Sequence, residues 1–246
     1  MMKNLLILLL SASLLFACSK EKESNLHIIG KIEGLKKGEL FLQKIEDDTL
    51  IVNLDSLKID GNPNFQFHTY LESPQLLFLY LNRKGGDKND DIIKFFAEKG
   101  EMGIQGNLRT FPKKAVVTGS KNHDALEKYL EMIKKYDERN LDLLQKSFEA
   151  GKTDDQKALL KIDQRYDQLL RAKYLYTVNF AINHKNMEIA PFLAISEVYD
   201  ANINYLDTIY NSLTKEVKKS KYGKSLKKLL KERRELERLN EKVQEQ

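Results

Sequence analysis

The stretch KAVVTGSKNHDALEKYL, residues 114–130, contains the point at which the chain changes its pattern. Up to Gly119, apolar residues come in short runs separated by turn residues, which is typical of β-strands. After it they recur every three or four residues, as Leu126 and Leu130 do, which predicts a helix. Ser120 stands at the boundary and fits the N-cap of that helix. The stretch therefore predicts an α+β chain, with strands first and helices afterwards.

Working back from this stretch, the short apolar runs predict an antiparallel β-sandwich or barrel of about seven to eight strands over residues 26–120. The first two runs lie close enough in sequence to form a hairpin. The run LLFLYL (residues 76–81) is continuously apolar and is expected to be buried on both faces. The expected strands are residues 27–34, 39–45, 50–59, 65–69, 76–81, 92–97, 102–106 and 114–120.

Working forward from it, residues 121–246 are predicted to be helical. A first helix over residues 123–150 is marked by Leu126, Leu130, Ile133, Tyr136, Leu141, Leu144 and Phe148, and Gly151 is expected to end it. A second helix is expected to begin at a capping box formed by Thr153 and Gln156 and to pair with the first as an antiparallel hairpin. Shorter helices follow at residues 186–200 and 206–213, and a densely charged last helix begins near Tyr222.

The N-terminal sequence is typical of an export signal. A short positive segment, residues 1–4, precedes an apolar run over residues 5–16 that is too short to span a bilayer, which takes about 20 residues. The tetrapeptide Leu15-Phe16-Ala17-Cys18 follows, and it resembles the bacterial lipobox. That resemblance implies cleavage between Ala17 and Cys18 and attachment of a diacylglyceryl group to the Cys18 thiol, with residues 1–17 removed as a lipoprotein signal peptide. Residues 18–25 are then expected to be a flexible tether.

The resemblance also implies a location. A lipid-anchored chain of this kind is expected in the cell envelope, on the outer membrane, and the pattern leaves open whether it faces the periplasm or the surface. Cys18 is the single cysteine of the sequence, so an intramolecular disulfide and a Cys-x-x-Cys pair are excluded.

The order of short motifs carries a further resemblance. IIGKIEGL (residues 28–35), GELFL (38–42), FFAEKG (95–100) and VVTGS (116–120) together resemble a β-rich domain of unknown function at the N-terminus of Bacteroidota lipoproteins. In many members of that family a thioredoxin-like domain of the AhpC/TSA type, with a Cys-x-x-Cys motif, follows. This sequence ends where that domain would begin, so the resemblance implies the fold but not thiol–disulfide exchange.

Composition argues against several classes of function. The chain has 41 basic and 36 acidic residues, for a net charge of +5, and the charges of both signs are spread along it, so no nucleic-acid partner is expected. Its four histidines, His27, His68, His123 and His184, are scattered without metal-binding spacing. The sequence therefore predicts no metal site and no cofactor, and it identifies no small-molecule ligand.

Four groups of residues are candidate sites, and each also has a simpler structural interpretation, which we favour. The basic run 215–234 could bind anionic lipid headgroups or an acidic partner, or be a solvated helix face. A tyrosine group could line a glycan or peptide groove, or be core packing; it comprises Tyr166, Tyr174, Tyr176, Tyr199, Tyr205 and Tyr210. The pairs Asp47-Asp48 and Asp90-Asp91 could bind calcium but lack the loop motif. Ser120 with His123-Asp124 suggests a hydrolase, but Ser120 fits a helix N-cap better.

These observations predict a non-catalytic, membrane-anchored envelope lipoprotein that acts as a binding or assembly module with a protein partner. The alternative is an accessory subunit for a separate thioredoxin-like thiol–disulfide oxidoreductase. A pocket in which acids, bases and a histidine converge would instead favour an enzyme of unrecognised type.

Overall fold

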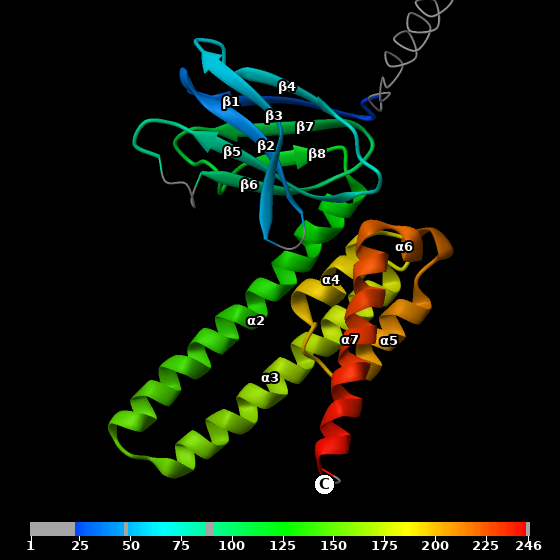
Figure 1. Ribbon diagram of the computed structural model, residues 1–246. Helices are drawn as coiled ribbons and strands as arrows, with labels where there is room; N and C mark the ends of the chain where they lie inside the picture. The colour runs from blue at the N-terminus through cyan, green and yellow to red at the C-terminus, as the bar shows by residue number, and fades with distance from the viewer. Residues whose placement is uncertain (1–22, 47–48, 87–90, 245–246) are drawn as a thin grey trace, which may run out of the picture.

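The computed structural model describes residues 23–46, 49–86 and 91–244. These residues form eight strands in two four-stranded sheets, followed by helices, so the expected α+β class is confirmed (Figure 1). The strands are β1 (Leu26–Glu33), β2 (Lys37–Glu46), β3 (Leu50–Asp60), β4 (Asn64–Thr69), β5 (Gln75–Asn82), β6 (Ile92–Ala97), β7 (Gly100–Asn107) and β8 (Val116–Thr118).

The two sheets have the strand orders β4-β1-β7-β8 and β3-β2-β5-β6. Neighbouring strands within each sheet are antiparallel, except β1 and β7, which run parallel. The expected hairpin between the first two strands is wrong, because β1 and β2 belong to different sheets. The chain crosses between the sheets at Gly34, whose φ of 82° suits glycine, and the crossing lets each strand bury its apolar face against the other sheet.

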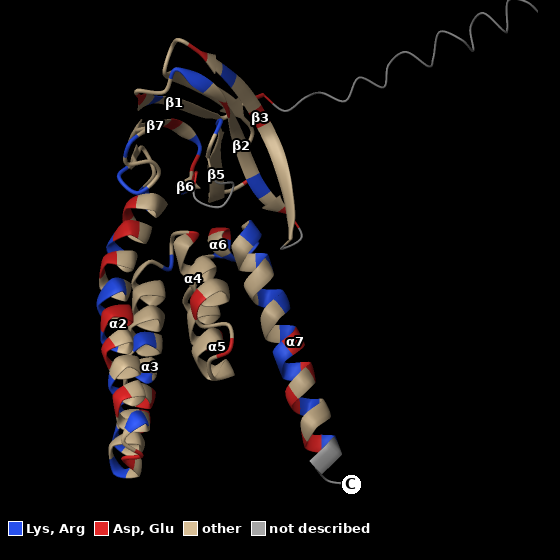
Figure 2. Cartoon of the chain, turned by 90° about the vertical axis from the view of Figure 1, so that its left-hand side faces the viewer, with Lys and Arg blue, Asp and Glu red and all other residues tan. Residues whose placement is uncertain are grey.

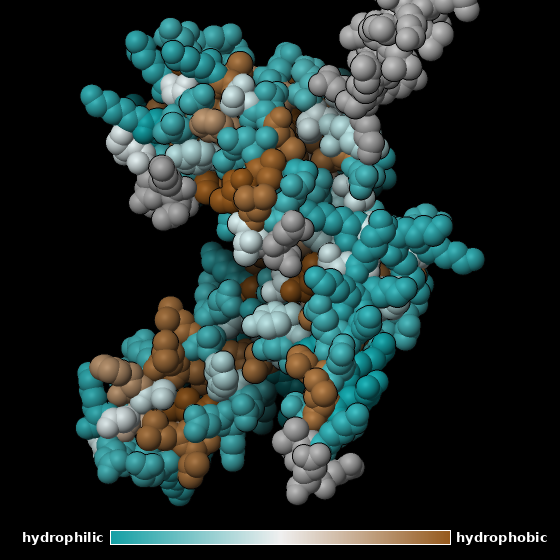
Figure 3. Space-filling view, in the orientation of Figure 1, coloured by the Kyte–Doolittle hydropathy of each residue, from teal (hydrophilic) through white to brown (hydrophobic). Residues whose placement is uncertain are grey.

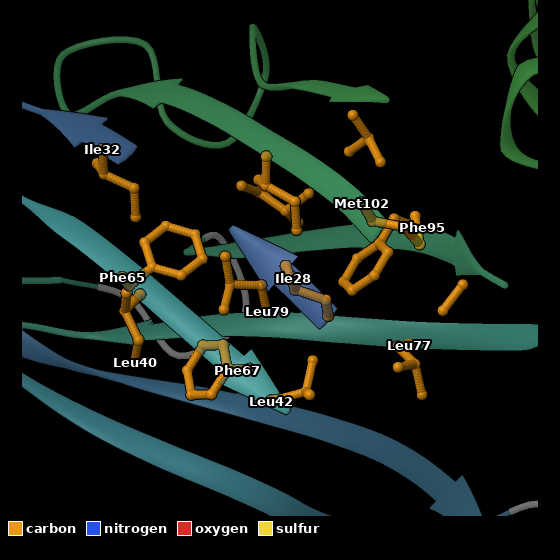
Figure 4. Packing of buried hydrophobic residues seen from close by; sticks show 14 of the residues in the cluster. Ile28, Ile32, Leu40, Leu42, Phe65, Phe67, Leu77, Leu79, Phe95 and Met102 are labelled. Atoms are coloured by element: carbon orange, nitrogen blue, oxygen red, sulfur yellow. The ribbon is translucent and has the colours of Figure 1, made fainter. Parts of the chain in front are cut away.

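The core of the sandwich lies between the sheets (Figure 4). Ile28, Phe65, Leu79 and Met102 are at most 2% exposed, and each such side chain contributes about 1.5–3 kcal/mol through burial. Gly30 makes room for this packing, since a Cβ at that position would lie 2.2 Å from the Phe65 ring.

Strand β5 departs from the expectation of burial on both faces. Its inward residues Leu77, Leu79 and Leu81 are buried, whereas Phe78 and Tyr80 on the outer face are half-buried. The reason is that the helices cover only one end of this sheet, where Leu76 packs against them.

Helices fill the rest of the chain. They are α2 (Lys121–Lys152), α3 (Gln156–Asn183), α4 (Ile189–Glu197), α5 (Ile203–Ser212), α6 (Lys215–Lys219) and α7 (Lys221–Gln244). Helices α2 and α3 form the expected antiparallel hairpin, and α4 to α7 pack around its end nearest the sandwich (Figure 1). Among the described residues, no helix is both long and apolar enough to span a bilayer.

Of the two helix N-caps that the sequence predicts for this hairpin, that of α2 is present and that of α3 is at a different residue. The Ser120 hydroxyl accepts a hydrogen bond from the backbone N–H of His123 at 3.0 Å, so the expected N-cap of α2 is confirmed. Helix α2, however, continues through Gly151. Thr153 is therefore its C-cap, and Asp155 caps α3 by accepting from the N–H of Ala158, so the expected capping box at Thr153 is wrong.

Candidate functional site

The sandwich and the helices are joined by a hydrogen-bonded network at the start of α2. The Glu98 carboxylate, in the turn between β6 and β7, accepts from the Ser120 hydroxyl and from the backbone and side-chain N–H groups of Asn122. The Asn122 side-chain oxygen in turn accepts from the N–H of Ile189 at 2.8 Å. A carboxylate at a helix N-terminus is favoured by the helix dipole. This network ties the sandwich, α2 and α4 together.

An aromatic cluster reinforces the same junction. The ring of Phe96 lies 5.5 Å from that of Phe192 and 5.8 Å from that of Tyr222. The Tyr222 hydroxyl accepts from the N–H of Leu76 at 2.9 Å, and burial raises the pKa of Tyr222 to about 12. Lys221 also donates to the carbonyl of Ile45 at 3.1 Å. The start of α7 is therefore fixed to the sandwich by both packing and hydrogen bonds.

A cleft of about 1140 Å³ opens beside this junction, and we call it the junction cleft. Burial raises the pKa of the Glu188 carboxyl, and the charge of Glu98 raises it further. The lining mixes acidic and basic groups, so it suits a polar ligand carrying both signs of charge. It comprises Lys44, Glu46, Tyr70, Glu72, Ser73, Pro74, Gln75, Glu98, Lys99, Glu188, Glu216, Lys219, Ser220, Lys221 and Lys224.

The Ser120 and His123 pair beside the cleft serves the fold. The Ser120 hydroxyl donates to Glu98 and accepts from the backbone of His123, so it does not bond to the imidazole. The His123 Nδ1 accepts from the backbone N–H of Phe96 at 3.3 Å, and burial lowers the pKa of His123. The hydrolase hypothesis requires a hydrogen bond from the Ser120 hydroxyl to the His123 imidazole, whereas Ser120 caps α2, so this geometry supports the capping interpretation of the pair.

The far part of the α2–α3 hairpin, residues 137–170, shows a feature that the sequence expectation missed. Tyr136, Leu143 and Ala150 recur every seven residues; the Tyr136 ring lies beside that of Tyr176 on α3, and Leu143 and Ala150 are buried. Leu141, Leu144 and Phe148 are instead 66%, 65% and 66% exposed. Figure 3 shows apolar side chains gathered over this part of the two helices.

These three exposed residues, which we call the outer seam, recur at intervals of three and four. Each residue turns an α-helix by about 100°, so around the helix axis Leu144 lies about 100°, Phe148 about 140° and Leu141 about 160° from the buried Leu143. A hollow of about 140 Å³ between α2 and α3 opens on the same side. It is lined in part by Asp137, Tyr166 and Leu170, and Asp137 precedes Leu144 by seven residues, or two helical turns.

Comparison with known families adds one finding. Residues 26–126 match the family model described as Domain of unknown function (DUF4369). This confirms the resemblance to a β-rich domain of unknown function. The DUF4369 match extends into the first turns of α2 and so includes Glu98, Ser120 and His123. No curated protein and no solved structure matches the chain.

Downstream of the DUF4369 region, the candidate tyrosines do not form one stripe. The Tyr174 hydroxyl donates to Asp200 at 2.8 Å, and the Tyr176 ring stacks on that of Tyr129 at 5.8 Å. Tyr205 and Tyr210 pack against the helical core, whereas Tyr199 is exposed. Their positions favour packing over a shared groove.

The basic run is divided between two roles. Lys and Arg residues recur along α7 (Figure 2). A shallow groove along this helix is lined by Lys224, Lys227, Lys228, Lys231, Arg234, Glu235 and Arg238. Arg233 instead donates to the carbonyls of Tyr199 and Ala201, and Arg234 also pairs with Asp207. Part of the run therefore anchors α7 to the helical core, and the solvent-facing part remains available for anionic groups.

The remaining candidate residues are the two aspartate pairs and the expected cleavage and lipidation site at the N-terminus. Asp91 is buried and makes two hydrogen bonds with Arg83, at 2.8 and 2.9 Å, which accounts for its charge without calcium. Asp47, Asp48 and Asp90 lie outside the described residues, as do Ala17 and Cys18 of the expected cleavage and lipidation site. In the described part of the chain, no group of three or more His, Cys, Asp or Glu could hold a metal ion.

Proposed function

We propose that the protein is a non-catalytic, membrane-anchored lipoprotein of the bacterial envelope that acts as a binding or assembly module. The N-terminal pattern ending in Ala17-Cys18 supports the anchor. The outer seam supports the binding role and is the observation that carries it. In water, three large apolar side chains on one helix face expose surface that a partner would bury at a gain of about 25 cal/mol per Å².

The spacing of the outer seam indicates what kind of partner fits. Apolar residues at alternating intervals of three and four form the contact line between packed helices. Helix α2 already uses one such line against α3, and the outer seam is a second line that lies mostly on the opposite side of the helix. The hollow lined by Tyr166 and Leu170 offers room for a side chain of the incoming helix. The partner is therefore an amphipathic helical segment of another envelope protein, which adds a third helix to the hairpin.

Site-specific crosslinking in intact envelopes tests this proposal. A photoreactive residue in place of Leu144 should crosslink to one partner, and mass spectrometry should map the contact to a helical segment with apolar residues three and four apart. A photoreactive residue in place of Leu236, which is 56% exposed on α7, is the matched control and should not give this product. Phe148→Lys should abolish the Leu144 crosslink while changing stability by less than about 0.5 kcal/mol, because the site is exposed.

The result can also contradict the proposal. Capture of a second copy of this chain alone would show self-association instead, and capture of a Cys-x-x-Cys protein would favour the accessory-subunit alternative. Equal crosslinking at Leu144 and Leu236 would mean that the outer seam is not a binding surface.

The anchor has its own test. Cys18→Ala should shift the protein from the membrane fraction to the soluble fraction and remove its labelling by palmitate, because two acyl chains are what hold such a protein on a bilayer. Ser19→Ala, next to it, should leave both unchanged. Membrane retention of the Cys18→Ala protein would overturn the lipoprotein proposal.

A further inference from the structure

Two histidines that lie 41 residues apart in the sequence meet on the outer face of the first sheet. His27 on β1 and His68 on β4 are register partners, and both side chains are exposed. Their Nδ1 atoms lie 2.7 Å apart and their ring planes cross at 80°. One ring therefore donates its Nδ1 proton to the other, and two nitrogen ligands are already held at the distance of a direct contact.

The strand pairing holds this arrangement in place. The N–H of Ile32 donates to the carbonyl of Pro63, and residue pairs in an antiparallel ladder alternate between hydrogen-bonded and non-hydrogen-bonded types. Counting back along the register, His27 and His68 form a non-hydrogen-bonded pair. In such pairs the Cα atoms are only about 4.5 Å apart and the side chains are closest. The backbone therefore brings the two rings together without a loop that could open.

The other two histidines of the chain have ring nitrogens engaged by the fold. The Nδ1 of His123 accepts from the backbone of Phe96, and its side chain is buried. The Nδ1 of His184 contacts the carbonyl of Phe180, and its ring stacks on that of Phe180. His27 and His68 are thus the histidines whose rings bond to each other at the surface.

We propose that His27 and His68 form a binding site for a divalent metal ion with square-planar preference, Cu²⁺ above all. With metal–nitrogen bonds of about 2.0 Å, two neighbouring nitrogens lie about 2.8 Å apart on a square-planar ion and about 3.3 Å apart on a tetrahedral one. The Nδ1 atoms lie 2.7 Å apart as hydrogen-bond partners, so both rings must turn from that bond for their lone pairs to converge on such an ion. Cu²⁺ also binds nitrogen ligands more tightly than the other divalent ions of its row.

Binding needs a lone pair on both Nδ1 atoms. The ring that donates its Nδ1 proton moves to the tautomer with the proton on Nε2, so both nitrogens face the ion as neutral ligands.

The site leaves coordination positions open. Glu101 on β7 is the register partner of His27 on the same outer face, but no group of three such residues among those described is arranged to hold an ion. The remaining positions are then filled by water or by groups from another molecule. An open two-nitrogen site at the surface suits an ion that is taken up and passed on rather than one that stabilises the fold.

Copper titration of the full-length protein, purified in detergent without a polyhistidine tag, tests the proposal. One Cu²⁺ should bind per chain, and its electron paramagnetic resonance spectrum should show coupling to two imidazole nitrogens. His27→Asn and His68→Asn should each weaken binding by about tenfold or more, since losing a hydrogen-bonding partner of a ligand already costs about that much.

Gln66→Ala is the matched control, because Gln66 pairs with Ile29 in the same ladder and on the same face. It should leave the affinity and the spectrum unchanged. The proposal is overturned if the His27→Asn/His68→Asn double variant binds copper as tightly as the wild type, or if the spectrum lacks coupling to imidazole nitrogen.

Discussion

His123 shows how a single buried residue couples the fold to pH. Burial lowers its pKa, and Glu127 and Asp124 oppose that shift only in part. In the unfolded chain a histidine takes up its proton near pH 6.5, whereas in the fold it does so at a lower pH. The unfolded state therefore binds more protons in this window, and the fold loses stability as the pH falls below about 6.5.

His123→Asn tests this effect, because the Asn side-chain oxygen can accept from the N–H of Phe96 but does not titrate. The variant should be less stable than the wild type at neutral pH through lost packing. Its urea midpoint should nevertheless change less between about pH 7.5 and about pH 5.5. The other titrating groups are common to both proteins, so the difference between the two curves isolates His123. Parallel curves would show that His123 does not contribute to the acid sensitivity.

At the scale of single residues, features that depend on sequence neighbours could be predicted from the sequence, whereas features that depend on distant residues could not. Ser120 was identified as a cap because capping depends on three neighbouring residues. Thr153 and Asp155 both fit a cap, and the choice between them depends on how far α2 continues, which packing decides. The contact between His27 and His68 requires the register of β1 on β4, and no sequence pattern specifies that register for two residues 41 positions apart.

Helix α2 illustrates the same limit at the scale of an element. The apolar residues from Leu126 to Phe148 are helical, as their spacing of three or four residues predicts. They are in fact two sets: Leu126 and Ile133 are buried, whereas Leu130 and the outer seam are exposed. Periodicity reports that a residue lies on an apolar stripe, but the position of α3 determines which stripe becomes buried. The expected β1–β2 hairpin failed for a similar reason, since closeness in sequence does not decide which sheet a strand joins.

The two ends of the hairpin should differ in stability. Near the sandwich, α2 packs against β6 and α4, and Tyr129 is fully buried with its hydroxyl bonded to Thr177 at 2.8 Å. Beyond residue 137, the two helices pack mainly on each other. Local opening requires less free energy where fewer apolar contacts are lost.

Hydrogen exchange measures this difference. Amides of residues 137–170 should exchange at least about tenfold faster than those of residues 123–133, which is a difference of about 1.4 kcal/mol in the opening free energy. Leu143→Ala should speed exchange in the far part only, and Leu144→Ala, its exposed neighbour, should have little effect. Uniform protection along α2 would show that the hairpin opens as one unit.

At the scale of the whole molecule, the junction determines whether the sandwich and the helices unfold together. Phe96 is fully buried and connects β6 to α4 and α7 through its contacts with Phe192 and Tyr222. The class of fold, and the order in which strands and helices follow one another along the chain, could be predicted from the sequence. The junction could not be predicted. The spacing of apolar residues describes one strand or helix at a time, whereas Leu76, Phe96 and Tyr222 come from three separate segments. The junction cleft, which forms between these same segments, was missed for the same reason.

Phe96→Ala should uncouple the two parts. Truncating a buried phenylalanine costs about 3–5 kcal/mol, and here the loss falls on the contacts that hold the helices to the sandwich. The chain has no tryptophan, so Tyr80→Trp on β5 adds a single fluorescent reporter of the sandwich, while far-UV circular dichroism follows the helices. With Phe96 present, the two urea transitions should coincide, as expected for one cooperative unit. With Phe96→Ala they should separate, and with Phe96→Leu, which keeps most of the apolar contact, they should stay together. If the transitions coincide in Phe96→Ala as well, the remaining junction contacts, including the hydrogen bonds of Glu98, Asn122 and Tyr222, are sufficient to couple the two parts.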